Sequence, residues 1–291
     1  MTEGSAAARR RNGRDKSKVM RARWIKFGWA LLGLAVAACG TNLAGGDSGS
    51  DGSNVGDGAS DGKIDDGSDG GTASDAGDIL GTLSGSCGEV RTELDKTSPS
   101  LKNDALLFVT GEVYNKTSLS TGGQKLFDQP NAGGSSTESE AMSFEVLHYC
   151  EGATLLKTET EVTYGPAPDG GANSITDLEV EIDGKKVGVS VTRAYKPQNQ
   201  GAQTDAEIKS LLEKKLNGIN ASTARVSAQD KWVKQVLHVF AATQGSVDGI
   251  SRVLPTIDAT LRADTIVLVT KTIGGGFIYC DPDPALGLEC P

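Results

Sequence analysis

Acidic and hydroxyl side chains recur at alternate positions along three strand-like segments, 155–164, 175–182 and 186–195. Successive side chains of a strand point to opposite faces of its sheet, so alternate residues share a face. The polar residues that would share one face are Glu159, Glu161, Asp177, Ser190 and Thr192. Acids gathered in this way can build a functional site. The pattern by itself favours a simpler interpretation, the solvated face of an amphipathic sheet.

Two capping boxes predict where helices begin. Thr137 and Glu140 have the Ser/Thr-x-x-Glu spacing that opens a helix, which we expect to reach about Tyr149. Thr204 and Glu207 repeat that spacing further along the chain. The helix that follows has an apolar stripe made of Ile208, Leu211, Leu212, Leu216 and Ile219.

Apolar runs predict the remaining strands. They lie at 106–114, 236–242 and 265–272, and a helical connection interrupted by Pro255 joins the last two. The resulting order is helix, three strands, helix, strand, helix, strand. This order predicts an α/β domain in which helices flank a central mixed sheet.

Four segments carry a resemblance to a known superfamily: AGGSSTESEAMSFEVL, LLKTETEVTYG, SITDLEVEIDGKKVGVSVTRAY and LLEKKLNGI. Together they resemble the core of the PD-(D/E)XK, or restriction-endonuclease-like, superfamily, over about residues 132–272. In active members, a Glu on the first helix, an Asp on the second strand and an acid-x-Lys pair on the third hold magnesium ions. Those ions polarise a phosphodiester and activate water. The resemblance implies a restriction-endonuclease-like core for this α/β domain.

Carried over by position, Glu140 matches the helix Glu and Asp177 matches the strand Asp, so these two would be the metal ligands of an active site. The third-strand motif falls on Ser190 and Thr192. A hydroxyl is a poorer magnesium ligand than a carboxylate, and Thr192 supplies no ammonium group. The neighbouring strand offers two substitutes, Lys157 and Glu161. The motif is degenerate, and we expect no cofactor unless the site is active, in which case Mg²⁺ is implied.

A cysteine follows a short apolar run near the start of the chain. Basic residues precede the run 27–38, and the small residues Val-Ala-Ala stand directly before Cys39. This arrangement resembles a bacterial lipoprotein signal, which implies cleavage before Cys39, lipidation of that residue and anchoring to a lipid bilayer. A transmembrane anchor is the alternative, but the run is well short of the ~20 residues needed. Gly40, rather than Asp, follows the cysteine, which resembles the pattern of lipoproteins that are passed to the outer membrane. The protein would then lie at the periplasmic face of that membrane or at the cell surface.

Composition divides the chain into three parts. Residues 1–38 are the predicted signal peptide, with Met20 as an alternative start. Residues 39–86 are dominated by Gly, Ser, Asp and Ala, which predicts a disordered tether behind the lipidated cysteine. Its Asp-rich repeats lack the closing Glu of a calcium loop. Residues 87–291 are enough for one globular domain with a core.

Charge limits the partners. Residues 1–38 hold 9 of the 29 basic residues and 2 of the 38 acidic ones, so the rest of the chain has 20 basic residues against 36 acidic. Long-range attraction to nucleic acid is therefore not expected. Contact with nucleic acid is still possible through a local basic patch. That patch consists of Lys185, Lys186, Arg193, Lys196, Lys214 and Lys215. The sequence identifies no protein partner.

Four cysteines fall in the globular part, and export would allow them to form disulfides. We predict a local Cys280–Cys290 bridge in the Pro-rich tail and consider Cys87–Cys150 as a second one. Zinc is the weaker interpretation, because close C-x-x-C pairs are absent.

Two classes of function remain. One is a non-catalytic binding or structural lipoprotein with a nuclease-like core, and the other is a metal-dependent phosphodiesterase acting outside the cytoplasm. The acidic domain, the missing acid-x-Lys motif and the lipid tether favour the first class.

Overall fold

The computed structural model describes residues 75–76, 81–108, 116–130, 137–167, 173–197 and 200–279. The strands are β1 (Asp75–Ala76), β2 (Gly81–Gly85), β3 (Ser100–Leu107), β4 (Thr154–Thr158), β5 (Leu178–Ile182), β6 (Lys185–Ala194), β7 (Lys234–Ala241) and β8 (Ile266–Ile273). The helices are α1 (Thr121–Asp128), α2 (Thr137–Glu151), α3 (Asp205–Arg225), α4 (Gln244–Val253) and α5 (Ala259–Arg262). Short 3-10 turns are η1 (Arg91–Glu93), η2 (Lys116–Ser118), η5 (Ala228–Asp230), η6 (Leu254–Thr256) and η7 (Gly276–Ile278).

All eight strands form one mixed sheet in the order β1-β2-β3-β8-β7-β6-β5-β4. β4, β5 and β6 make an antiparallel meander, whereas β6, β7, β8 and β3 run parallel. The helix α2 precedes the meander, and α3 connects β6 to its parallel neighbour β7. The predicted α/β class, with a central mixed sheet flanked by helices, is therefore confirmed, as is the predicted order of elements from α2 to β8.

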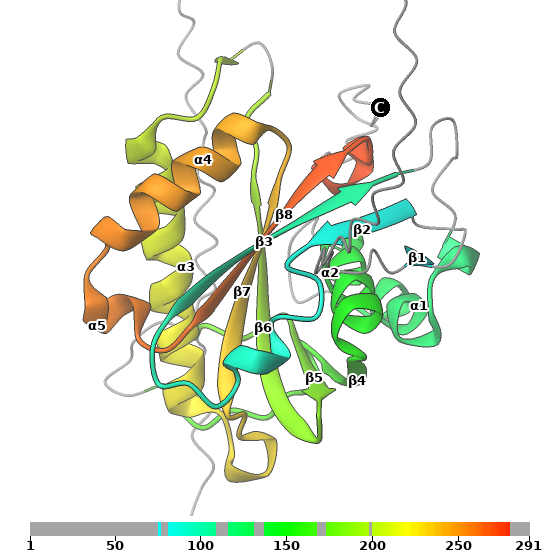
Figure 1. Ribbon diagram of the computed structural model, residues 1–291. Coiled ribbons are helices and arrows are strands. Elements are labelled where there is room, and N and C mark those ends of the chain that lie inside the picture. The colour runs from blue at the N-terminus through cyan, green and yellow to red at the C-terminus, as the bar shows by residue number, and fades with distance from the viewer. Residues whose placement is uncertain are drawn as a thin grey trace, which may run out of the picture. The chain divides into compact units, whose positions relative to one another are not determined.

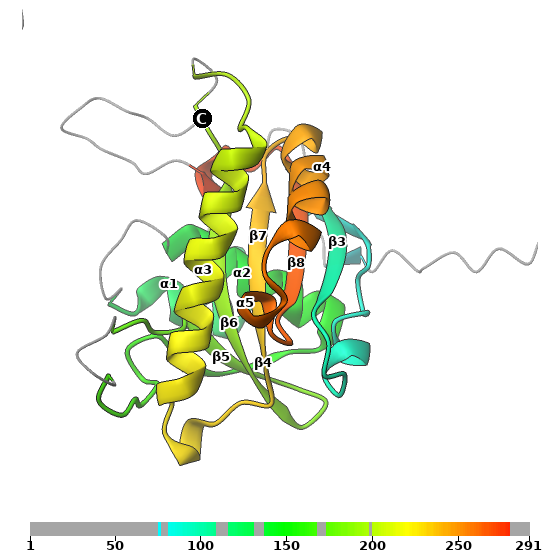
Figure 2. The same cartoon turned by 90° about the vertical axis from the view of Figure 1, so that its left-hand side faces the viewer.

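Helices cover both faces of the sheet (Figures 1 and 2). The first core lies on the α2 side and includes Met142, Phe144 and Leu147 of α2 with Val187, Val189 and Val191 of β6. The second lies on the α3 and α4 side and includes Ile208, Leu212 and Leu216 of α3 with Leu237 and Val239 of β7. Alternate residues of β6 and β7 thus enter different cores. Within the described part of the chain, none of the helices is long and apolar enough to cross a bilayer.

The two predicted capping boxes have different outcomes. The α3 box is confirmed, because Thr204 Oγ1 accepts a hydrogen bond from the Glu207 amide and the Glu207 carboxylate accepts one from the Thr204 amide. Residue Thr137 is instead the first residue inside α2. The helix that it was predicted to open is present and extends to Glu151.

Three predicted boundaries are corrected. The strand expected at 106–114 overlaps β3 only at Leu106 and Leu107, because β3 begins earlier, at Ser100, and pairs in parallel with β8. Residues 109–114 lie outside the described part of the chain. The strand expected at 155–164 ends at Thr158, because the Glu161 carboxylate accepts the Thr158 amide and closes a turn there. The predicted tether, 39–86, overlaps β2, which pairs with β3 and places Leu83 in the core. Cys39 and the pair Cys280–Cys290 lie outside the described residues.

Candidate functional site

The second and third strands of the meander separate at Asp177, the residue that matches the motif Asp. The paired residues of β5 and β6 end with Leu178 opposite Val189, and the Asp177 amide donates to the Val189 carbonyl over 3.0 Å. The Asp177 carboxylate then accepts the amide hydrogen of Val191. From α3, Lys215 Nζ donates to the Val191 carbonyl over 2.7 Å. Both backbone polar groups of Val191 are therefore bound by side chains.

Hydroxyl side chains flank Val191 along β6. Ser190 and Thr192 are both buried, and they alternate with β6 residues that enter the α2-side core. Thr176 Oγ1 donates to the Val189 carbonyl over 2.9 Å and lies 3.3 Å from Ser190 Oγ. The prediction of a solvated polar face is wrong for β6, because α3 packs over it.

Burial controls the protonation of Asp177. Loss of hydration raises the pKa of this carboxyl to about 6. The ammonium of Lys215 and the Val191 amide oppose the rise, and the charge of Glu159 adds to it. The group therefore exchanges its proton just below neutral pH, as many functional carboxyls do.

Lys215 is the residue at this place that the sequence motifs did not indicate. The signal was its spacing, because it stands four residues after Leu211 and four before Ile219, in one row along α3. Leu211 is partly buried and Ile219 is buried. A lysine within a row that faces the sheet is placed to reach a buried partner with its ammonium group.

The two predicted substitutes have other partners. A β-bulge between Leu155 and Lys157 places Lys157 opposite Glu179, and its Nζ donates to Asp230 over 2.5 Å. Glu161 lies in the turn after β4, where its carboxylate accepts the Thr158 amide over 2.9 Å and pairs with Lys125 over 2.8 Å. Each side chain therefore has a local structural role.

The remaining metal-ligand candidate, Glu140, is a buried residue in the first turn of α2, the helix on the opposite face of the sheet from α3. In the part of the chain that the structure describes, no three His, Cys, Asp or Glu side chains group closely enough to hold a metal ion. Two carboxylates, those of Asp177 and Glu159, are close enough for the charge of Glu159 to raise the pKa of Asp177. The third-strand positions add only the hydroxyls of Ser190 and Thr192, which are poorer Mg²⁺ ligands than carboxylates.

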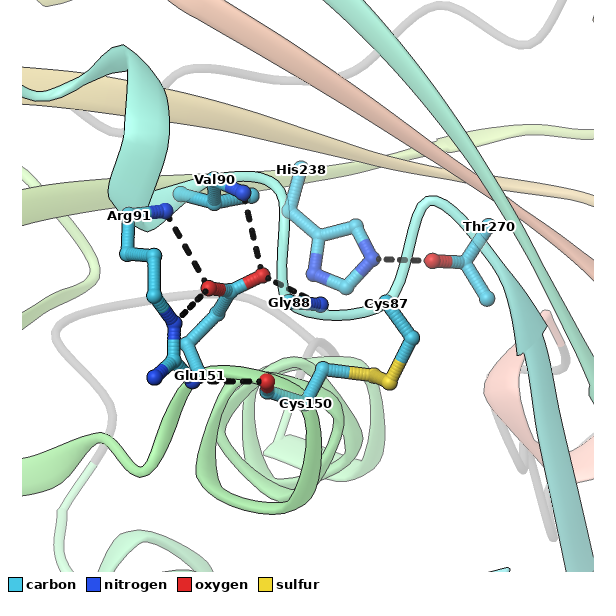
Figure 3. The surroundings of a disulfide bond; sticks show 8 residues. All are labelled: Cys87, Gly88, Val90, Arg91, Cys150, Glu151, His238 and Thr270. Atoms are coloured by element: carbon cyan, nitrogen blue, oxygen red, sulfur yellow. Dashed lines mark hydrogen bonds and ion pairs between the residues drawn. A yellow bond between two sulfur atoms is a disulfide. The ribbon is translucent and has the colours of Figure 1, made fainter. Parts of the chain in front are cut away.

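A second polar cluster surrounds a disulfide on the α2 face (Figure 3). Cys87 and Cys150 are bridged, which confirms the second predicted pair. The neighbouring Glu151 carboxylate accepts the amides of Gly88, Val90 and Arg91 at 3.0–3.1 Å. The Arg91 side chain pairs with the same carboxylate at 3.2 Å. The bridge and the carboxylate together fix the segment before η1 to the end of α2.

A buried histidine lies in the same core. His238 Nδ1 is 2.8 Å from Ser143 Oγ, and its Nε2 is 2.8 Å from Thr270 Oγ1. Burial lowers the pKa of His238 to about 3, so the ring stays neutral at physiological pH. Both ring nitrogens are bound inside the core, which suits a structural histidine.

Comparisons with known proteins give limited matches. No protein-family model matches the chain. A curated relative, the AAC-rich mRNA clone AAC4 protein of Dictyostelium discoideum, is 40% identical over 167 residues, or 55% of this chain. The chain covers 24% of that relative's length. Among solved structures, SfsA of Pyrococcus furiosus in complex with Ca²⁺ is similar at 14% identity and a TM-score of 0.26, over 50% of this chain and 70% of that one. A likeness of that size assigns no role to any residue of this chain.

Proposed function

We propose that the protein is an exported lipoprotein, anchored through Cys39, whose nuclease-like α/β domain has a non-catalytic binding or structural role. The observation that carries the proposal is the pair of hydrogen bonds made by the side chains of Asp177 and Lys215. Both side chains bind the backbone of Val191 at the point where β5 leaves β6. Asp177, which would hold a metal ion in an active relative of this core, here completes the sheet together with Lys215.

The degenerate third-strand motif supports the same proposal. Ser190 and Thr192 supply hydroxyls where metal-dependent hydrolysis needs a carboxylate and an ammonium group. Lys157 and Glu161 are held by Asp230 and Lys125, respectively.

Charge supports a partner other than nucleic acid. Members of the predicted basic patch are neutralised within the domain by the ion pairs Lys185–Asp95, Lys186–Glu179 and Lys196–Glu207. Neutralised lysines on an acidic protein give little counterion release, the main source of non-specific affinity for nucleic acid. We propose a protein or cell-envelope partner.

The disulfide bond supports export. The Cys87–Cys150 bridge is of a kind that persists outside the reducing cytoplasm. The small residues directly before Cys39 also match the pattern of a lipoprotein signal. We propose that the lipid bilayer, at the outer membrane, is the first partner of the mature chain.

One observation favours the alternative, a metal-dependent phosphodiesterase. Lys215 brings an ammonium group from α3 to the side of Asp177, close to the place where Thr192 lacks one. Lys215→Met separates the two functions. In a phosphodiesterase it abolishes hydrolysis, whereas in our preferred account there is no hydrolysis to lose and only stability falls.

Cell fractionation tests the anchoring. We expect the wild-type protein in the membrane fraction and Cys39→Ala as an uncleaved precursor without lipid. Cys39→Ala that is processed and membrane-bound like wild type would refute the lipoprotein assignment. Ser48→Ala, in the segment behind the cysteine, is the matched control and should behave as wild type.

A further inference from the structure

The carboxyl ends of the parallel strands carry most of the large apolar side chains that the described residues expose. Four such side chains are exposed, and three stand at these ends: Leu107 of β3 (46%), Ile273 of β8 (48%) and Tyr195, directly after β6 (40%). We propose that this apolar edge, made of Leu107, Ile273 and Tyr195, lies against the lipid bilayer. The inference rests on the proposed anchoring and names the surface that the anchored domain presents to the membrane.

Strand pairing brings the two aliphatic side chains together. Leu107 and Ile273 are register partners in the parallel pair of β3 and β8, so both point to the same face of the sheet (Figure 1). Leu106 enters the α2-side core, so this face is the opposite one. In Figure 2, α3, α4 and α5 lie in front of β6, β7 and β8, whereas β3 lies beside them. The end of the β3–β8 pair is thus exposed on this face.

Tyr195 extends the apolar edge toward β6. It follows Ala194, which shares a row across the sheet with Ala241 of β7 and Lys271 of β8. Its ring centroid lies 5.1 Å from that of Tyr279, so a neighbouring ring supports it. A tyrosine has an apolar ring and a polar hydroxyl, which suits the boundary between hydrocarbon and lipid headgroups.

One lysine lies beside the aliphatic pair. Lys271 stands two residues before Ile273 on the same face and makes no hydrogen bond or ion pair within the described part of the chain. A lysine next to apolar surface reaches polar headgroups with its ammonium group. The neighbouring side chains that share this face on β2 and β3 are uncharged: Thr82, Ser84, Asn103 and Ala105. No carboxylate of β2, β3 or β8 therefore opposes a lipid contact on this face.

The tethered end of the chain joins the domain in the same row of the sheet. Asp75 of β1 pairs with Thr82 of β2, which is in turn the partner of Leu107. Residues 40–74 separate this row from Cys39, and a flexible linker of that length has an r.m.s. span of roughly 30–35 Å. Such a tether holds a domain at a local concentration of about millimolar, so a contact of a few side chains suffices. The entry point of the tether favours the bilayer as the partner of the apolar edge.

Quenching of tryptophan fluorescence by brominated lipids tests this contact. Cleavage before Cys39 removes two of the three tryptophans, so the processed lipoprotein keeps only Trp232, which is 3% exposed. Ile273→Trp adds a tryptophan to the apolar edge. Val233→Trp is the matched control, because Val233 is the fourth exposed apolar residue (53%) and precedes β7, at the opposite end of the parallel strands.

The processed lipoprotein is purified in detergent and reconstituted into phosphatidylcholine vesicles with brominated or unbrominated acyl chains. Flotation of the vesicles comes first. Protein that does not float refutes the proposed anchoring, and this inference with it. For protein that floats, we expect brominated lipid to remove most of the emission that the added tryptophan of Ile273→Trp contributes. Wild type and Val233→Trp should keep their emission. Adding Leu107→Asn to Ile273→Trp should weaken the quenching, because half of the aliphatic pair is lost.

The choice of surface is overturned, with the anchoring intact, if floating Ile273→Trp is quenched no more than Val233→Trp. A concentration-dependent blue shift of Ile273→Trp without quenching would also overturn it, and would identify a second copy of the chain as the partner of the apolar edge.

Discussion

Replacing Asp177 by Asn and by Ala separates its hydrogen bond from its charge. Asn keeps an oxygen that can accept the Val191 amide hydrogen, whereas Ala leaves that buried donor unpaired. An unpaired buried donor costs about 1–3 kcal/mol. At pH 5, where both variants are neutral at this position, we expect the free energy of unfolding of Asp177→Ala to be lower than that of Asp177→Asn by this amount.

The charge of Asp177 affects how the free energy of unfolding depends on pH. The folded pKa is about 6 against an ordinary value of 3.8, so the folded state binds the proton more tightly than the unfolded state. Wild type therefore gains stability as the pH falls from about 6 to about 4, and loses that gain as the pH rises, by at most roughly 3 kcal/mol. Asp177→Asn has no carboxyl group at this position and therefore lacks this pH dependence. Its stability relative to wild type should rise between pH 5 and pH 8.

Urea unfolding at pH 5 and pH 8, followed by circular dichroism, measures these differences. Asp248→Asn, an exposed acid on α4, is the control and should follow wild type at both pH values. Equal stability of the Asn and Ala variants at pH 5 would refute the claim that this carboxylate completes the sheet. A pH-independent difference between wild type and Asp177→Asn would refute the raised pKa.

Three further changes test other parts of the structure by the same unfolding assay. Glu151→Gln should lower stability by about 2–4 kcal/mol, because the charged acceptor of three backbone amides and Arg91 is lost; a change below 1 kcal/mol, roughly one neutral hydrogen bond, would contradict this. Replacing both Cys87 and Cys150 by Ala should cost roughly 4 kcal/mol for a bridge spanning 63 residues, and reduced wild type should match the double variant. Burial raises the pKa of Asp104 to about 7, so this residue adds to the stability that wild type gains as the pH falls from about 7 to about 4. Asp104→Asn should make that slope shallower and leave the part due to Asp177; an unchanged slope would show that Asp104 does not contribute to it.

Local signals in the sequence predicted much of the fold. The box at Thr204 and Glu207, followed by an apolar stripe, defined α3 from its first turn. The mostly apolar segments at 236–242 and 265–272 became the central parallel strands β7 and β8, which are covered on both faces. Such patterns depend only on neighbours along the chain or on complete burial.

The candidate site was harder to predict because it depends on distant contacts. Strand alternation placed Glu159 and Glu161 on a sheet face, but a bulge at Lys157 and a turn at Thr158 move both residues out of β4. The same alternation suggested a solvated face, and only the packing of α3 shows that it is buried. Lys215 belongs to no motif, and its meeting with Val191 is a tertiary contact between α3 and β6.

The central claim is that the domain does not hydrolyse phosphodiesters, and its most direct test is an assay of the purified full chain on single- and double-stranded DNA and RNA. Each substrate is incubated with Mg²⁺, with Mn²⁺ and with a chelator, for wild type, Asp177→Ala and Thr192→Lys. We predict no metal-dependent cleavage by wild type. Cleavage by Thr192→Lys alone would identify an otherwise intact relic of a nuclease site. Robust metal-dependent cleavage by wild type that Asp177→Ala abolishes would contradict the account.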